Sequence, residues 1–144
     1  MKAFKNTLIL CLFLTFLSSS AQTVRDKFIG KWKGVDGGDI GYFIVDADEH
    51  ASFVYNGQVM GGKSFDYDGK NAKMKFQVTE QEDGIYYLDL SIIIIDSGIT
   101  ESKMLCIVKF LDYDTMKFGS NFGSGDRPLV FSDDNSLIFK RQKN

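Results

Sequence analysis

A two-residue period in hydrophobicity, interrupted at short intervals by turn-forming residues, constrains this chain more than any other feature. In residues 72–78, Met74, Phe76 and Val78 alternate with lysine and glutamine. Successive side chains of a β-strand point to opposite faces of a sheet, so this pattern predicts strands with one apolar face. The same alternation recurs in three later segments, residues 88–92, 104–110 and 137–141.

Short turns divide the chain at regular intervals. Asn56-Gly57, Asp68-Gly69 and Asp83-Gly84 supply residues that tolerate the positive φ of tight hairpins. We expect strands near residues 31–35, 40–47, 51–56, 63–67, 72–79, 85–96, 103–111, 115–119 and 136–142. Such a meander closes into a barrel or packs as a sandwich. A barrel removes exposed sheet edges, so we predict an all-β fold, a single up-and-down antiparallel β-barrel of eight or nine strands.

A short helical turn is expected before the first strand. Thr23 and Asp26 have the spacing of a capping box, and Gly30 suits the position that ends a helical turn.

The first 21 residues have the organisation of a secretory signal peptide. Lys2 and Lys5 precede an apolar run over residues 8–17, and Ser19-Ser20-Ala21 places small residues where a signal peptidase cleaves. The run is too short to span a hydrocarbon core of about 30 Å as a stable anchor. We expect cleavage after Ala21, one domain over residues 22–144, and a secreted or periplasmic protein without stable membrane insertion.

Charge and cysteine content narrow the class of protein further. Loss of Lys2 and Lys5 leaves 15 basic residues against 19 acidic ones, a net charge of about −4, with no basic cluster. Nucleic-acid binding requires cations that neutralise phosphates, so we expect no nucleic-acid partner. Cys106 is the only cysteine after residue 21. It lies in an apolar segment, which predicts a buried and unreactive thiol.

No arrangement of residues indicates catalysis or metal binding. His50 is the only histidine, and it lies between two predicted strands, where we expect a solvated turn. The acidic turns, such as residues 112–114, do not continue to the glutamate that completes a calcium-binding EF-hand loop. Asp89 has strongly apolar neighbours, but the alternation places it on the outer face. We therefore expect no catalytic residue, no metal site and no cofactor.

The predicted interior is rich in large aromatic side chains. An eight-stranded barrel is just wide enough to be filled by side chains or to hold one small ligand. Tyrosine hydroxyls would orient an otherwise apolar ligand. The candidate ligand-binding residues are Tyr55, Tyr67, Phe76, Tyr86, Phe110 and Phe118.

The most specific motif consists of two short segments, one near the start and one near the end of the predicted barrel domain. Residues 28–33, Phe-Ile-Gly-Lys-Trp-Lys, resemble the opening of the lipocalin and fatty-acid-binding families of the calycin superfamily. Residues 137–141, Leu-Ile-Phe-Lys-Arg, resemble their last strand. The likeness is greatest to short bacterial lipocalin-like domains with a signal peptide. It implies that Gly30, Trp32 and Arg141 close one barrel end, with the arginine packed on the indole.

The resemblance and the aromatic interior together favour one function over two others. We expect an exported binding protein that holds a small hydrophobic or amphipathic ligand in the barrel mouth, away from Trp32. A filled barrel would instead act through its surface, as an inhibitor or an accessory protein of an envelope complex. An enzyme on the same scaffold would need converging polar groups inside the barrel, which the sequence barely provides.

Overall fold

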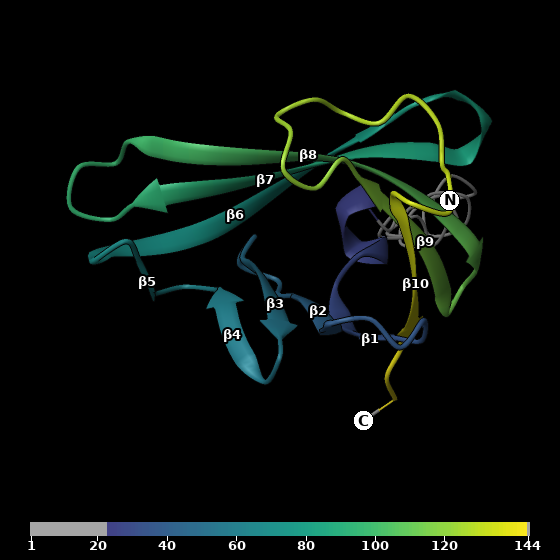
Figure 1. Ribbon diagram of the computed structural model, residues 1–144. Helices are drawn as coiled ribbons and strands as arrows, with labels where there is room; N and C mark the ends of the chain where they lie inside the picture. Colours follow the sequence, from purple (N-terminus) through teal and green to yellow (C-terminus); the bar gives the residue numbers. More distant parts are fainter. Residues whose placement is uncertain (1–22, 144) are drawn as a thin grey trace, which may run out of the picture.

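The computed structural model describes residues 23–143, and the predicted signal peptide lies outside them (Figure 1). The described chain forms one antiparallel sheet with the strand order β4-β3-β2-β1-β10-β9-β8-β7-β6-β5. The strands are β1 (Gly30–Gly34), β2 (Ile40–Val45), β3 (Ala51–Tyr55), β4 (Gln58–Gly61), β5 (Phe65–Tyr67), β6 (Lys70–Glu80), β7 (Ile85–Ile94), β8 (Thr100–Asp112), β9 (Thr115–Ser120) and β10 (Ser136–Arg141). Two short 3₁₀ turns, η1 (Val24–Lys27) and η2 (Glu82–Gly84), complete the fold. The all-β, barrel-like prediction is confirmed.

The predicted number of strands, eight or nine, is wrong, because β4 makes ten. The predicted Asn56-Gly57 turn connects β3 to β4, in which Tyr55 pairs with Gln58. Gln58, Val59 and Met60 are all exposed, so β4 has no buried apolar face, and polar and apolar residues do not alternate along it.

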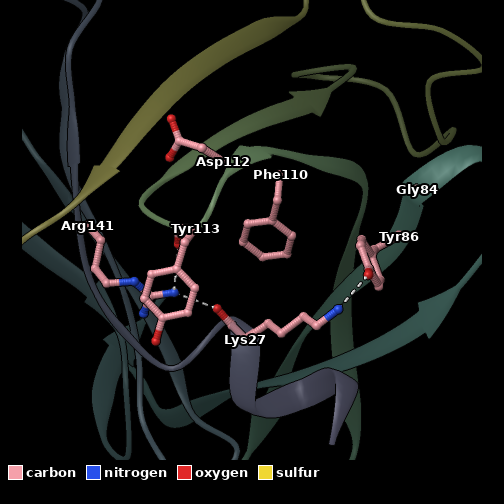
Figure 2. Close-up of a pocket in the computed structure, with 7 residues that line it drawn as sticks. All are labelled: Lys27, Gly84, Tyr86, Phe110, Asp112, Tyr113 and Arg141. Atoms are coloured by element: carbon pink, nitrogen blue, oxygen red, sulfur yellow. Dashed lines mark hydrogen bonds between the residues drawn. The ribbon is translucent and has the colours of Figure 1, made fainter. Parts of the chain in front are cut away.

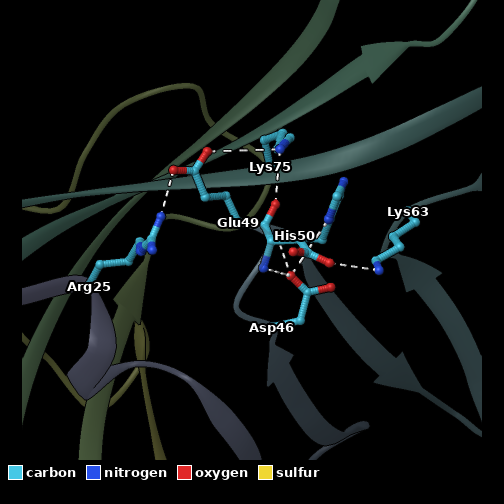
Figure 3. Close-up of polar contacts among 7 residues, drawn as sticks. Arg25, Asp46, Glu49, His50, Lys63 and Lys75 are labelled. Carbon is cyan, nitrogen blue, oxygen red and sulfur yellow. Dashed lines mark hydrogen bonds and ion pairs between the residues drawn. The ribbon is translucent and has the colours of Figure 1, made fainter.

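The sheet nearly closes on itself along one edge of β6 (Figure 3). The Phe76 amide donates to the Glu49 carbonyl at 3.0 Å, and the Met74 amide donates to the Gly62 carbonyl at 2.9 Å. The Glu49 side chain accepts from Arg25 of η1 at 2.7 Å and lies 3.9 Å from the ammonium of Lys75. A few hydrogen bonds and ion pairs thus replace a full strand ladder at this seam.

Aromatic rings fill the middle of the barrel. Phe43, Phe53, Phe118 and Phe139 are at most 3% exposed, and the centroids of the contacting rings are 4.8–6.0 Å apart. Packing at these separations leaves no space for a ligand among the four rings. Any bound molecule must therefore lie nearer to one of the two barrel ends.

The hairpins alternate between the two ends of the barrel. At one end, which we call the closed end, η1 lies beside the β6–β7 and β8–β9 hairpins. At the other end, the mouth, a long segment over residues 121–135 connects β9 to β10. Figure 1 shows this yellow-green segment arching across β8. The expected contact between Thr23 and Asp26 is present at the start of η1, since the Thr23 amide donates to the Asp26 carboxylate at 3.1 Å. The expectation that Gly30 ends this turn is wrong, because η1 is capped by Phe28 and Gly30 begins β1.

Candidate functional site

Trp32 and Arg141 lie together at the closed end. They are paired across β1 and β10, and the Arg141 guanidinium carbon lies 4.1 Å from the centre of the Trp32 ring. Arg141 also donates to the carbonyls of Ile29 at 2.7 Å and Lys27 at 2.9 Å. The fully buried indole donates to the Phe28 carbonyl at 2.9 Å. This arrangement ties η1, β1 and β10 together.

Gly30 makes the close approach at this end possible. Its φ of +142° is a conformation that side chains disfavour, and a Cβ there would lie 3.0 Å from Nη1 of Arg141. A side chain at this position would therefore strain the backbone and crowd the guanidinium, which favours glycine here.

A pocket of about 280 Å³ opens beside Arg141 at the closed end (Figure 2). Phe110 and Tyr86 form its aromatic floor, and Tyr113 and Arg141 line one side. The Lys27 ammonium lies 3.2 Å from the Tyr86 hydroxyl. The pocket thus combines an aromatic floor with two cations, Lys27 and Arg141, two tyrosine hydroxyls and the Asp112 carboxylate.

A second pocket, of about 380 Å³, lies at the mouth. The register pairs Met74 of β6 with Ile92 of β7, and Leu90 of β7 with Met104 of β8, so these four side chains lie on two adjacent rows of the inner face. Met60 of β4 lies among the lining residues, and Ser120 of β9 forms another wall with residues 121–125 of the long segment. Ser102, Lys103 and Asn121 add polar groups to the lining.

The long segment after β9 has two parts with different surroundings. Its glycine-rich start, residues 121–125, lines the mouth pocket. Further along, Arg127 donates to the Cys106 carbonyl at 2.7 Å, pairs with Asp89 and lies 4.1 Å from the centre of the Tyr87 ring. The second part is therefore fastened to the outer face of β7 and β8, and it holds the first part over the mouth.

The six predicted ligand-binding residues do not gather in one place. Tyr86 and Phe110 line the closed-end pocket, while Phe76 and Phe118 belong to the buried core. Tyr67 of β5 packs edge-on against Phe65. Tyr55 lies outside the predicted interior: its ring is 46% exposed and its hydroxyl lies 3.2 Å from the Asp39 carboxylate.

Sequence reasoning missed the mouth residues because they share no motif. Met60, Met74 and Met104 come from three strands, and only the fold brings them together. Met60 lies on β4, whose exposed residues show no alternation of polar and apolar side chains in the sequence. The glycine-rich residues 121–125 were the one sequence signal that pointed to this end of the barrel.

Three groups singled out for possible chemistry are held in structural roles. Cys106 is fully buried, and burial raises the pKa of its thiol to about 12, as predicted for an unreactive cysteine. Asp89 is on the outer face, paired with Arg127. The expectation that His50 lies in a solvated turn is wrong, because its side chain is 13% exposed where His50 bridges to Lys75 of β6.

One exposed ion pair beside His50 also shifts the ionisation of its members. The Asp48 carboxylate accepts a 2.8 Å hydrogen bond from Lys63. That bond and the lysine charge lower the pKa of Asp48 and raise the pKa of Lys63. The pair links the β2–β3 turn to the segment between β4 and β5, and because both groups are exposed we expect it to contribute little to stability.

Comparison with known proteins leaves the site to be interpreted from its geometry alone. Within residues 23–143, no cluster of three or more histidine, cysteine or acidic residues is arranged to hold a metal ion. The same residues contain no helix long and apolar enough to cross a membrane. No protein-family model, curated protein or solved structure matches the chain.

Proposed function

We propose that this protein is an exported, lipocalin-like binding protein that holds a small hydrophobic or amphipathic molecule in the barrel mouth. The observation that carries the proposal is the mouth pocket, with apolar side chains from β4, β6, β7 and β8 under a glycine-rich segment. Its size, about 380 Å³, falls at the small end of the range typical of ligand pockets, roughly 300–1,000 Å³.

The chemistry of the lining supports an adaptable apolar site. Methionine side chains are flexible and polarisable, so they fit ligands of different shape. Met74 and Leu90 are 3% and 2% exposed and supply a dry floor, whereas Met60 is 40% exposed at the rim. Lys103, Ser102 and Asn121 lie where the polar end of an amphipathic ligand would meet solvent.

Two neighbouring isoleucines give a matched test of the site. Ile92 points into the mouth pocket, while Ile93 lies on the opposite face of β7. We expect Ile92→Asp to abolish the fluorescence enhancement of the neutral apolar probe N-phenylnaphthylamine. Ile93→Asp places the same charge one residue away and should leave probe binding intact. Equal probe binding by both variants and the wild type would refute the mouth site.

The natural ligand and the export step are tested on protein from its own host. Native mass spectrometry should show a ligand adduct on the wild type that Ile92→Asp lacks. The polypeptide mass should correspond to a chain that begins at Gln22 and is found outside the cytoplasm. A clean apo mass together with no probe binding would contradict the binding function, and an uncleaved cytoplasmic chain would contradict export.

A second function, action through the outer surface, is favoured by one specific observation. The barrel centre is filled, and Leu129 and Val130 are 95% and 70% exposed on the segment that crosses β7 and β8. Exposed apolar side chains of this kind are typical of protein contacts. If this function holds, Leu129→Ser with Val130→Ser should abolish cross-linking to an envelope protein in the host while probe binding persists.

A further inference from the structure

We propose that the closed-end pocket is a second binding site, specific for a small aromatic carboxylate. This site differs from the mouth in position and in chemistry. Its ligand would place a carboxylate against the Lys27 ammonium and the Tyr86 hydroxyl, and a ring over Phe110 (Figure 2).

The Lys27 ammonium has no acidic partner among the described residues. Within residues 23–143, no carboxylate lies within ion-pair distance of Lys27. Its one described side-chain hydrogen bond is to the neutral Tyr86 hydroxyl at 3.2 Å. A carboxylate bound here would gain charge-assisted hydrogen bonds, which are about twice as strong as neutral ones.

The position of the cation is defined by its aromatic neighbours. The Tyr86 ring is 6% exposed, and the Lys27 ammonium lies 5.6 Å from its centre. Phe110 packs edge-on against Phe28 at 5.0 Å and against Tyr86 at 5.7 Å. These contacts fix the floor, so the hydroxyl and the ammonium are presented to the pocket in a defined geometry.

The remaining lining residues favour an aromatic ring over an alkyl chain. Tyr113 lines the pocket and is 73% exposed, so its ring is free to stack on a bound ring. A volume of about 280 Å³ suits a single-ring ligand. The two terminal nitrogens of Arg141 donate to backbone carbonyls, and its Nε lies 3.4 Å from the Asp114 carboxylate, so Lys27 is the cation at this pocket without a described carboxylate partner.

One acidic side chain also lines the pocket and sets the orientation of the ligand. The Asp112 carboxylate accepts the Asp114 amide at 2.8 Å. In Figure 2 it lies on the other side of Phe110 from the Lys27 ammonium. Repulsion by Asp112 therefore favours the orientation in which the ligand's carboxylate faces Lys27 and its ring faces Asp112.

The test uses phenylacetate as the probe and phenylacetamide as its neutral counterpart, followed by NMR titration of the mature protein. We expect phenylacetate to shift the signals of Tyr86, Phe110 and Tyr113 and to bind more tightly than phenylacetamide. Lys27→Met should weaken phenylacetate binding about tenfold or more, the loss expected for one charge-assisted hydrogen bond. Tyr86→Phe should weaken it less, because only the hydroxyl is removed.

Ile92→Asp at the mouth is the control, and it should leave phenylacetate binding unchanged. An unaltered thermal unfolding curve for Lys27→Met will separate lost recognition from lost folding. The proposal fails if phenylacetate does not bind at millimolar concentration, if phenylacetamide binds equally well, or if folded Lys27→Met binds phenylacetate as the wild type does. None of these outcomes bears on N-phenylnaphthylamine binding at the mouth, so the two proposals fail independently.

Discussion

The two ends of this barrel are built from different kinds of interaction. At the closed end, a guanidinium, an indole and three backbone carbonyls are joined by directional contacts of 2.7–4.1 Å. At the mouth, three methionines and a glycine-rich segment meet through apolar contact, and the hydrogen bonds within residues 121–125 are few. Directional bonds define one geometry, whereas methionine and glycine permit several. The difference indicates that the closed end is held in one geometry and that the mouth can change shape, as the proposed binding function requires.

The largest expected effect comes from removing the charged group that holds the closed end. Arg141→Ala removes the contact with Trp32 and leaves the carbonyls of Lys27 and Ile29 without their donor. We expect the free energy of unfolding to fall by about 3 kcal/mol, from one cation–π contact and two charged hydrogen bonds. Chemical denaturation measures this change.

Arg141→Lys is the matched control for that experiment. It keeps the charge but cannot reach two carbonyls with a planar fork, so we expect an intermediate loss of stability. Both variants should bind N-phenylnaphthylamine as the wild type does wherever they remain folded. An Arg141→Ala variant with unaltered unfolding would contradict the stabilising role of the closed end.

A smaller effect is expected at Gly30. Alanine there must adopt φ +142° and approach Nη1 of Arg141 to 3.0 Å, so we expect a loss of about 1–3 kcal/mol. Gly125→Ala at the mouth is the comparison, because a Cβ at that glycine meets nothing within 4 Å. Equal melting temperatures for the two variants would show that the two ends do not differ in this respect.

Removing the contacts that attach the long segment to β7 and β8 should lower the free energy of unfolding by a smaller amount. Arg127→Ala removes the contacts with Cys106, Asp89 and Tyr87, and we expect a loss of about 1–2 kcal/mol. Amide exchange over residues 121–135 should accelerate, and N-phenylnaphthylamine binding should weaken as the wall of the mouth pocket moves. Asp126→Ala, a neighbouring exposed position, is the control. Unchanged exchange in Arg127→Ala would mean that the segment is held by other contacts.

The smallest expected effect concerns the buried thiol. Its pKa is raised from an ordinary value of 9.0 to about 12, so the folded protein holds this proton more tightly than the unfolded chain does. The contribution to stability is therefore neutral below pH 9 and becomes unfavourable as the pH rises above it. Cys106→Ala should flatten this alkaline loss of stability. A thiol reagent should modify native Cys106 only as fast as the protein opens, and rapid modification would contradict its burial.

The fold was predictable where side chains alternate and where residue types fix local geometry. The row Met74, Phe76 and Val78 predicted the inner face of β6, and Trp32 with Arg141 predicted the closed end. β4 was not predictable, since its exposed residues carry no apolar period.

The candidate site was less predictable because it depends on register and on the relative length of strands. Tyr55 follows the inward phase of β3, but it lies at the end of that strand and is exposed. Tyr86 and Phe110 do face inward, yet at the closed end. Periodicity indicates the face of a sheet on which a residue lies, and it does not indicate the height of that residue along the barrel axis.

The assignment of ligand binding to the mouth is tested most directly by the methionine methyl groups. The chain after residue 21 contains four methionines, of which Met60, Met74 and Met104 line the mouth pocket and Met116 is fully buried elsewhere in the core. We predict that titration of the methyl-labelled mature protein with decanol, a neutral amphipathic molecule, shifts the first three signals and leaves Met116 in place. A shift confined to Met116 and the indole of Trp32, or no shift at all, would contradict binding at the mouth.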